Sequence, residues 1–466
     1  MPVPEQTTTT TTTIIHASDK HNRQPLPSRI FLSGLDCYNF PSEICVQWLF
    51  HSAPESIQDA VFRLKSALSE ALELYPPMTG TICKDANDDL YISLENRNRP
   101  GTPFIFEIKD TPYDNDASAL QPRDFRVLLP VGSNTFIVKV VQFSCGTIGV
   151  ASSLHHQIAD PRGYMDFHAT WTQLARGELV DLKRIPYDWS RIPGRFFPPP
   201  SDGEPISPPP GIMIVSPKVD STSNRFGIPS VATKWKMSKS SLIQLKADLS
   251  PTPSSATDKW ISTGDALTSL IFGAITRARE NGNVARVEGR SSVESQIESI
   301  MVPGDGRFRI PPGNTEGSYF GNLNINCNYT VTRADLLSPT LEAARRVALA
   351  IRDQLECQLS TEAIANQLAF FENRKTSKSS ERISTTADVF LSNWCCFDLQ
   401  GPNYDFGFGK PFKATSGIDG RAVPGFVLLM QTHEFGEVFL WIGVEREGGE
   451  ELKADLLLNK YATLVQ

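Results

Sequence analysis

Residues 143–160 read FSCGTIGVASSLHHQIAD, and residues 163–176 after them carry apolar side chains at helical spacing. The part before the histidines consists of apolar and small residues, which is typical of a strand. His155, His156 and Asp160 therefore come where a strand ends and a helix begins. We predict that His156 faces a channel at this strand–turn–helix corner.

Histidine has an ordinary pKa near neutrality, so His156 can take a proton from an alcohol or an amine. Asp160 could bond the imidazole, or it could hold the turn by pairing with an arginine. The same residues also allow a core histidine beside a helix-capping aspartate. A metal site lacks a third and fourth ligand at suitable spacing, and a Ser-His-Asp hydrolase lacks a GxSxG segment. We therefore favour catalysis by His156 without a protein nucleophile.

The chain has 466 residues, a mass of 51.5 kDa and a net charge of −7. This length predicts two domains. The acidic balance argues against a nucleic-acid partner, because affinity for phosphates comes mainly from clustered Lys and Arg. None of the eight cysteines forms a CxxC pair, so we expect buried free thiols.

Targeting signals are not evident at the N-terminus, which lacks a basic start followed by an apolar stretch. The longest apolar runs, around residues 426–430 and 438–444, are too short to cross a bilayer. We expect a cytoplasmic protein with no membrane partner.

Four segments are predicted along the chain. Residues 1–25 are a polar, low-complexity tail that we expect to be disordered. Residues 26–190 form a first domain and residues 231–466 a second. Residues 191–230 form an extended crossover loop, because two triple-proline runs in that region oppose helix and interior strand.

Both predicted domains mix strands with helices. Strands are expected at residues 44–50, 90–94, 135–141, 426–430 and 437–445, the last two as a hairpin, and helices at residues 55–74, 163–176, 262–279, 341–358 and 361–371.

Two motifs resemble those of the BAHD acyltransferases, acyl-CoA-dependent enzymes of plants and fungi. HHQIAD at residues 155–160 resembles their HxxxD motif, and DFGFGKP at residues 405–411 resembles their DFGWGKP, with Phe408 in place of Trp. The motifs stand in the family's order. Shorter likenesses extend the resemblance to residues 28–460, and they lie at residues 35–36, 75–80, 262–268, 305–309, 319–322 and 392–394. Within this family, the sequence is similar to fungal trichothecene O-acetyltransferases.

The resemblance implies an α/β fold of two similar mixed-sheet-plus-helix domains, like chloramphenicol acetyltransferase, with a channel between them. It implies an acyl-CoA-dependent O-acyltransferase, expected to use acetyl-CoA and a hydroxyl of a secondary metabolite in a ternary complex. Acetyl-CoA is then a co-substrate, with no tightly bound cofactor and no metal. The other expected partner is the small-molecule alcohol, and the protein is expected to be a monomer.

The resemblance also assigns roles. His156 is the base, and Ser392 and Trp394 are hydrogen-bond donors to the oxyanion. Asp160, counted with the active-site residues, points away from the substrate and pairs with Arg307. Structural roles fall to Asp405, Gly407 and Gly409, and contacts with acyl-CoA to Thr263, Thr268, Asp305 and Lys410.

Two departures from the family pattern stand out. Pro161 and Arg162 follow Asp160 where the family has Gly, and Phe408 lacks the indole donor of Trp. Alternatives remain an N-acyltransferase, a carrier-protein-dependent condensation-type enzyme and an inactive binding relative. The DFGFG motif favours free CoA over a carrier protein.

Overall fold

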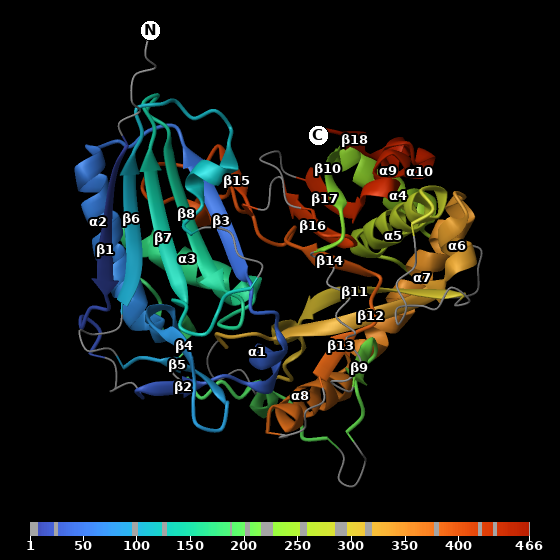
Figure 1. Cartoon of the computed structure of the whole chain (residues 1–466), viewed down its shortest axis with the longest axis horizontal. Helices are drawn as coiled ribbons and strands as arrows, with labels where there is room; N and C mark the ends of the chain where they lie inside the picture. Colours follow the sequence, from blue (N-terminus) through green and yellow to red (C-terminus); the bar gives the residue numbers. More distant parts are fainter. Residues whose placement is uncertain are drawn as a thin grey trace.

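The structure is a computed structural model that describes residues 8–22, 27–95, 101–123, 128–186, 189–200, 206–215, 227–251, 259–284, 296–312, 319–376, 382–417, 422–431 and 436–465. Within these residues the chain builds two large β-sheets, one in each half of the molecule (Figure 1).

The first sheet has six strands in the order β1-β6-β7-β8-β3-β15. Only β6 and β7 are parallel. β8 lies between β7 and β3, and all of its residues are buried, so the histidine motif follows directly from an interior strand. The strands are β1 (Thr9–His16), β3 (Glu43–Phe50), β6 (Gly101–Ile108), β7 (Phe136–Gln142), β8 (Ile148–His155) and β15 (Lys413–Thr415).

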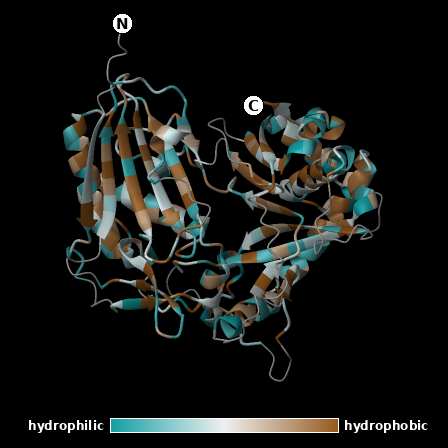
Figure 2. Cartoon of the chain, viewed as in Figure 1, coloured by the Kyte–Doolittle hydropathy of each residue, from teal (hydrophilic) through white to brown (hydrophobic). Residues whose placement is uncertain are grey.

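Two long helices, α2 (Ile57–Leu74) and α3 (Pro161–Ala175), pack against each other and against this sheet. Leu64 and Trp171 are fully buried between them, and the Trp171 indole N–H donates to the Leu64 carbonyl at 3.1 Å. Figure 2 shows apolar residues, in brown, along the strands that these helices cover. α3 thus holds the turn after β8 against the core.

The second sheet has seven strands in the order β12-β11-β14-β16-β17-β10-β18. β14 is parallel to β11 and β16, and the other pairs are antiparallel. The strands are β10 (Ser230–Met237), β11 (Ile297–Asp305), β12 (Asn324–Thr332), β14 (Val389–Asn393), β16 (Phe426–Gln431), β17 (Val438–Glu445) and β18 (Thr463–Leu464). The predicted hairpin near the C-terminus is confirmed as β16 and β17.

Helix α5 is the most enclosed helix of this half, with every residue from Asp265 to Ala278 buried. It packs against its neighbours α4, α6, α7 and α9. The helices of this half are α4 (Lys239–Leu249), α5 (Thr263–Asn281), α6 (Arg333–Leu337), α7 (Leu341–Gln358), α8 (Thr361–Thr376), α9 (Gly449–Lys453) and α10 (Leu456–Tyr461).

The two halves interlock. β15 comes from the C-terminal part of the sequence but pairs with β3 in the first sheet. Leu35, in α1 (Gly34–Tyr38), packs in the core of the second half, and Trp394 and Phe406 pack in the core of the first. Small sheets join β2 (Arg29–Phe31), β5 (Leu90–Ser93) and β4 (Thr81–Lys84), and also β9 (Ile212–Val215) and β13 (Arg382–Thr385).

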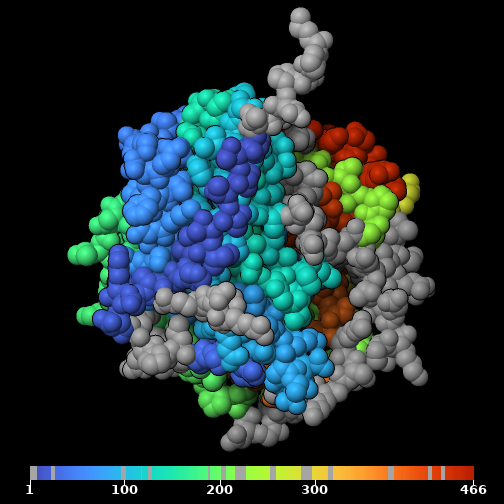
Figure 3. All heavy atoms as spheres, turned by 60° about the vertical axis from the view of Figure 1, so that its left-hand side comes forward, coloured from blue at the N-terminus to red at the C-terminus, as the bar shows by residue number. Residues whose placement is uncertain are grey.

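The prediction that residues 1–25 form a disordered tail is wrong for β1, which pairs with β6 over eight residues. Threonine is β-branched and fits a strand, so a polar edge strand can form despite its low complexity. Figure 3 shows β1, in dark blue, lying along the surface. Residues 1–7 and 23–26 lie outside the described residues. The other domain boundaries stay predictions.

Glutamine side chains cover the edge of β12. Each amide oxygen accepts from a strand N–H, and each amide nitrogen donates to the carbonyl of the same residue, at 2.8–3.2 Å. The pairs are Gln367 with Asn326, Gln358 with Asn328 and Gln354 with Thr330. We call these three side chains the glutamine ladder.

Candidate active site

His156 is the first residue after β8. Its main-chain N–H donates to the Ser42 carbonyl at 2.9 Å, and its carbonyl accepts from Nδ2 of Asn322 at 2.9 Å. The side chain is half-buried, whereas that of His155 is fully buried. Strand geometry sends successive side chains to opposite sides, so only one histidine of the pair can face a channel.

Burial lowers the pKa of His156, opposed by its own backbone, by Asp160, by Asn322 and by Asp36. Its Nδ1 is buried without a hydrogen-bond partner, and so is Oδ1 of Asn322. A ring with a lowered pKa is neutral at pH 7, which is the form that accepts a proton.

His155 cannot substitute for its neighbour. Burial, with Arg123 and His156, lowers the pKa of His155 to about 3. Its Nδ1 accepts from the Gln157 N–H at 3.3 Å. The His155 side chain therefore binds the turn that follows the strand.

Asp160 is the N-cap of α3, and its described hydrogen bonds join it to the helix start and to the second half. One carboxylate oxygen accepts from the Gly163 N–H at 3.0 Å, which caps the helix. The other accepts from Arg307 Nη1 at 2.9 Å and from the Leu323 N–H at 2.8 Å. Burial would raise the pKa of Asp160, but Arg307 and these hydrogen bonds lower it overall. The expected ion pair with Arg307 is present.

Asp305 lies beside the same arginine. Its Oδ1 accepts from Arg307 Nη1 at 3.0 Å, and its Oδ2 lies 3.4 Å from Arg162 Nε. The two basic side chains described beside Asp305, Arg307 and Arg162, both belong to the protein itself. A role for Asp305 toward CoA stays a prediction.

Arg162, the departure from the family pattern, joins α3 to the second half. Its guanidinium lies over the ring of Phe397 at 4.7 Å and over that of Phe308 at 5.7 Å. Pro161 takes the first helical position, where a missing N–H costs nothing. The altered motif therefore still starts the helix, and Arg162 adds a contact with Phe308 of the second half.

Ser392 and Trp394 form one unit at the end of β14. The Trp394 indole N–H donates to Ser392 Oγ at 3.1 Å, and Trp394 is 6% exposed. The indole hydrogen is thus engaged by Ser392 in this structure, and the roles of both residues toward an oxyanion stay predictions. The serine hydroxyl keeps its own hydrogen for another acceptor.

Asp405, Gly407 and Gly409 form a closed turn. Asp405 Oδ1 accepts from the Gly407 N–H at 2.7 Å and from the Gly409 N–H at 2.9 Å. Both glycines have positive φ, +89° and +83°. Arg63 of α2 donates to the Phe406 carbonyl at 2.6 Å, so the turn binds the second half to the first. These contacts fit a structural role.

Substitution of Gly407 by alanine is expected to destabilise this turn. The new Cβ would meet Arg63 Nη1 at 2.3 Å on a backbone that L-residues rarely adopt. We expect a loss of about 1–3 kcal/mol in the free energy of unfolding, measured in urea. Gly409→Ala is the control, because it has similar φ but open space, and it should cost less. An equal loss in both variants would contradict the role given to Arg63.

The predicted acyl-CoA contacts are less defined. Thr263 opens α5 beside the Ser262–Asp265 capping box, Thr268 is buried within α5, and Lys410 is exposed after the Asp405 turn. None of the described hydrogen bonds joins them to the network around His156. Their roles stay predictions.

Sequence reasoning missed three buried residues of this site, Asp36, Arg191 and Asn322. Asp36 pairs with Arg191, and Asn322 bridges Asp36 to His156. Asp36 and Asn322 lie in segments noted for their family likeness. Nothing local marks Arg191, whose partner lies 155 residues away.

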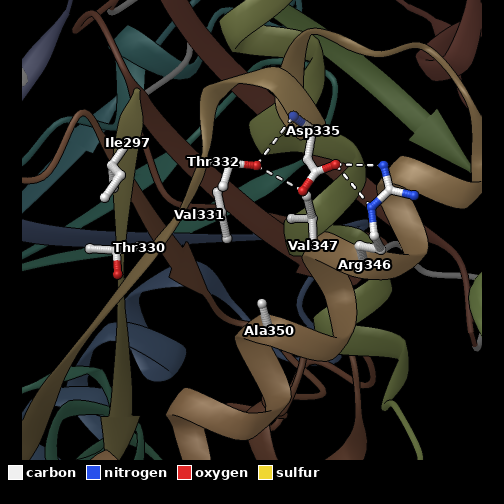
Figure 4. A pocket seen from close by; sticks show the side chains of 8 residues that line it. All are labelled: Ile297, Thr330, Val331, Thr332, Asp335, Arg346, Val347 and Ala350. Atoms are coloured by element: carbon white, nitrogen blue, oxygen red, sulfur yellow. Dashed lines mark hydrogen bonds and ion pairs between the residues drawn. The ribbon is translucent and has the colours of Figure 1, made fainter. Parts of the chain in front are cut away.

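A groove of about 210 Å³ lies apart from these residues, between the ends of β11 and β12 and helices α6 and α7 (Figure 4). Arg346 donates to Asp335 along one wall at 2.6 Å. The groove contains none of the predicted site residues.

Three further findings concern the part of the chain that the structure describes. Its histidines, cysteines and acidic residues form no cluster that could hold a metal ion. Its helices include none with the length and apolar character of a membrane span. All eight cysteines are free, but the prediction that they are buried is wrong for Cys145, Cys357 and Cys396, which are exposed.

A protein-family model with the description "Transferase family" matches residues 5–455 of this chain. Shikimate O-hydroxycinnamoyltransferase of Nicotiana tabacum is 24% identical over 368 residues, 76% of this chain and 78% of that protein. Anthranilate N-benzoyltransferase protein 2 of Dianthus caryophyllus is 26% identical over 365 residues, 75% of each chain.

Solved structures share the architecture. F. graminearum TRI101 complexed with coenzyme A and T-2 mycotoxin has a TM-score of 0.72 at 17% identity, covering 94% of this chain and 100% of that chain. Vinorine synthase has a TM-score of 0.67 at 17% identity, covering 97% and 98%. The predicted two-part α/β fold, like chloramphenicol acetyltransferase, is confirmed.

Proposed function

The chain belongs to the Transferase family, the BAHD acyltransferases, and from that premise we propose that it transfers an acetyl group from acetyl-CoA to a hydroxyl of a small secondary metabolite. Acyl-CoA-dependent acyl transfer follows from the family. The choice of acetyl and of a hydroxyl is the proposal. The observation that carries base-catalysed acyl transfer is the half-buried ring of His156, which directly follows β8 and whose pKa is lowered by burial.

In the proposed reaction, Nε2 of His156 takes the proton of the acceptor hydroxyl. The oxygen forms a bond to the thioester carbonyl carbon, and the carbonyl electrons move to its oxygen. Collapse breaks the carbon–sulfur bond, and the proton passes from His156 to the CoA sulfur. A positioned base supplies roughly 10²–10⁴-fold in rate, so a second contribution is needed at the oxyanion.

The Ser392 hydroxyl supports that second role. Because Oγ accepts from Trp394 Nε1, its own hydrogen is directed to another acceptor. We assign Ser392 as the donor to the oxyanion and Trp394 as the residue that orients it. Asp160 and Arg307 hold the turn beside the base and take no proton.

An acyl-CoA co-substrate is supported by the structures of F. graminearum TRI101, which are described as complexes of coenzyme A with T-2 mycotoxin or with deoxynivalenol. Transfer to nitrogen is the second candidate, favoured by the likeness to an anthranilate N-benzoyltransferase. The Asp405–Gly409 turn argues for free CoA over a carrier protein.

The test measures CoA thiol release with acetyl-, benzoyl- and hydroxycinnamoyl-CoA, each offered with alcohols and with amines. The proposal expects the highest kcat/KM with acetyl-CoA and an alcohol. A clear preference for amines, or for an aromatic acyl-CoA, would replace the proposed substrates by those of the second candidate. Absence of release with every pair would favour the inactive relative.

Ser392→Ala is expected to lower kcat by about 10²-fold, the usual effect of removing one oxyanion donor. Trp394→Phe should have a smaller effect, because it removes only the group that orients Ser392. The control is Ser269→Ala, which removes a buried hydroxyl that donates to the Ala344 carbonyl. A wild-type kcat in Ser392→Ala would show that Ser392 is not the donor to the oxyanion.

A further inference from the structure

A buried chain of hydrogen bonds joins the two elements that flank the turn of His156. Ser152 lies in β8, before this turn, and Tyr164 lies in α3, after it. Both residues are fully buried, and so is His168 one helical turn further along α3. Ser152 Oγ lies 2.6 Å from the Tyr164 hydroxyl and 2.8 Å from Nε2 of His168. The chain therefore closes the strand–turn–helix corner at its base.

The main-chain carbonyl of Tyr164 decides which nitrogen of His168 carries the hydrogen. His168 Nδ1 lies 2.8 Å from this oxygen, and a carbonyl oxygen can only accept. Nδ1 must therefore carry a hydrogen. Burial lowers the pKa of His168 to about 3, so the ring is neutral at pH 7 and has this one hydrogen. Nε2 is left as an acceptor.

The same choice fixes the direction of both hydroxyl groups. Ser152 Oγ must donate its single hydrogen to Nε2 of His168, because that nitrogen has none to give. Oγ can then only accept from the Tyr164 hydroxyl. Hydrogen bonding thus runs from Tyr164 to Ser152 to His168, and it returns to the main chain of α3 through Nδ1. Successive bonds of this kind strengthen one another in a low-dielectric interior.

Aromatic rings enclose the imidazole of His168. The ring centroid of Tyr164 lies at 4.5 Å and that of Trp48 at 4.9 Å. Three further rings lie within 6.1 Å, and they belong to Phe136, Phe167 and Trp171. Ser152 and the Tyr164 carbonyl are the hydrogen-bond partners of this imidazole among the described residues. A reversed tautomer would leave Nδ1 without a hydrogen against an oxygen atom.

The chain is attached to the turn on both sides. On the helix side, the Tyr164 N–H donates to the Asp160 carbonyl at 3.0 Å. On the strand side, Ser152 stands in the interior of the sheet, opposite Val46 of β3 and Val138 of β7. A shift of α3 along β8 would therefore move the turn that connects them.

We infer that His168 is a positioning residue: it sets one direction of hydrogen bonding through Ser152 and Tyr164, and this holds α3 against β8 on both sides of His156. A displacement of about 1 Å in a reacting group can cost about 10²-fold in rate, so the corner must be fixed. His168 itself exchanges no proton with a substrate. This inference rests on the proposed role of His156 as the base.

The test compares Ser152→Ala, which breaks the chain at its centre, with Ser152→Thr, which keeps a hydroxyl there. Ser269→Ala is the matched control, because it also removes one buried hydroxyl, which donates to the Ala344 carbonyl at 2.7 Å. Two readouts are used on folded protein. The first is the steady-state kinetics of acyl transfer from acetyl-CoA to the best alcohol of the panel. The second is ¹⁵N NMR of the His168 ring, assigned by its loss in His168→Gln.

We expect Ser152→Ala to lose about 10-fold in kcat with little change in the KM for acetyl-CoA, and Ser152→Thr and Ser269→Ala to keep the wild-type kcat. If Ser152→Thr does not fold, the comparison of the two alanine variants decides. In NMR, the wild-type His168 ring should carry its hydrogen on Nδ1. The inference is overturned by a wild-type ring protonated on Nε2, by a wild-type kcat in Ser152→Ala, or by an equal loss of kcat in Ser269→Ala.

The same measurements separate this inference from the proposed function. His156→Ala removes the proposed base, and it should leave the NMR signal of the His168 ring unchanged. Wild-type turnover by His156→Ala would therefore refute the base, whereas a His168 ring with its hydrogen on Nε2 would refute the positioning role.

Discussion

Replacement of His156 by alanine is expected to lower kcat by about 10³-fold or more, because the variant lacks the ring that we propose accepts the hydroxyl proton. The measurement is CoA thiol release with acetyl-CoA and the best alcohol of the panel. KM for acetyl-CoA should change little, because the ring acts in the transition state.

His51→Ala is the matched control for this prediction. His51 is exposed and its ring stacks on Phe412 at 4.5 Å, and the ring contacts described for it do not involve the turn after β8. It should retain the wild-type kcat. Turnover by His156→Ala at the wild-type rate would mean that another group removes the proton.

The pH dependence of kcat/KM should report the same ring. Burial lowers the pKa of His156 below its ordinary value of about 6.5. The neutral, active form therefore persists to lower pH than it does for a free histidine. Activity should hold through pH 6.5 and fall only as the pH drops through the lowered pKa. A fall in activity beginning above pH 7 would contradict this assignment.

Arg307→Met is expected to give the largest loss of stability, about 3–5 kcal/mol at pH 7, because it leaves Asp160 buried without its cation. The guanidinium makes further contacts with the Tyr319 and Gly321 carbonyls, at 3.1 and 2.9 Å. The variant thereby loosens both the helix start after His156 and the segment before Asn322. Urea unfolding measures the loss.

The sign of the pH effect provides a second check. The pKa of Asp160 is lowered in the folded protein, so the pair stabilises the fold above the unfolded value of about 3.9. That contribution is lost as the pH falls through the folded pKa. The difference between wild type and Arg307→Met should therefore shrink toward acid pH. The control is Arg346→Met, whose exposed pair with Asp335 should matter little. Equal losses in the two variants would contradict the prediction.

The histidine corner could be predicted because its signals are local. An apolar strand, a polar turn and a helical pattern are contiguous in residues 143–176, and the structure places β8 and α3 there. The partner of Asp160 required a different signal, since Arg307 lies 147 residues away. Only the resemblance of residues 305–309 to a motif of the family connected Asp160 with Arg307.

The rest depends on contacts that no local pattern encodes. Asp36, Arg191 and Asn322 are brought together by the packing of segments that are far apart in the sequence. β15 is three residues long, and its pairing with β3 depends on the path of the chain between the halves. The hydrogen bond from Trp394 to Ser392 depends on a side-chain rotamer. Sequence therefore predicted that His156 follows a strand, but not the groups that contact the main chain around it.

The glutamine ladder has a consequence for how molecules of this protein meet one another. The edge strand of a sheet normally has unpaired N–H and C=O groups that can pair with an extended strand of another molecule, and this is one route to aggregation. Along β12, side chains from α7 and α8 already occupy these groups at three alternate residues, so an incoming strand would have to displace six hydrogen bonds, two from each glutamine. This border of the second sheet is therefore closed to templated growth while its helices stay folded.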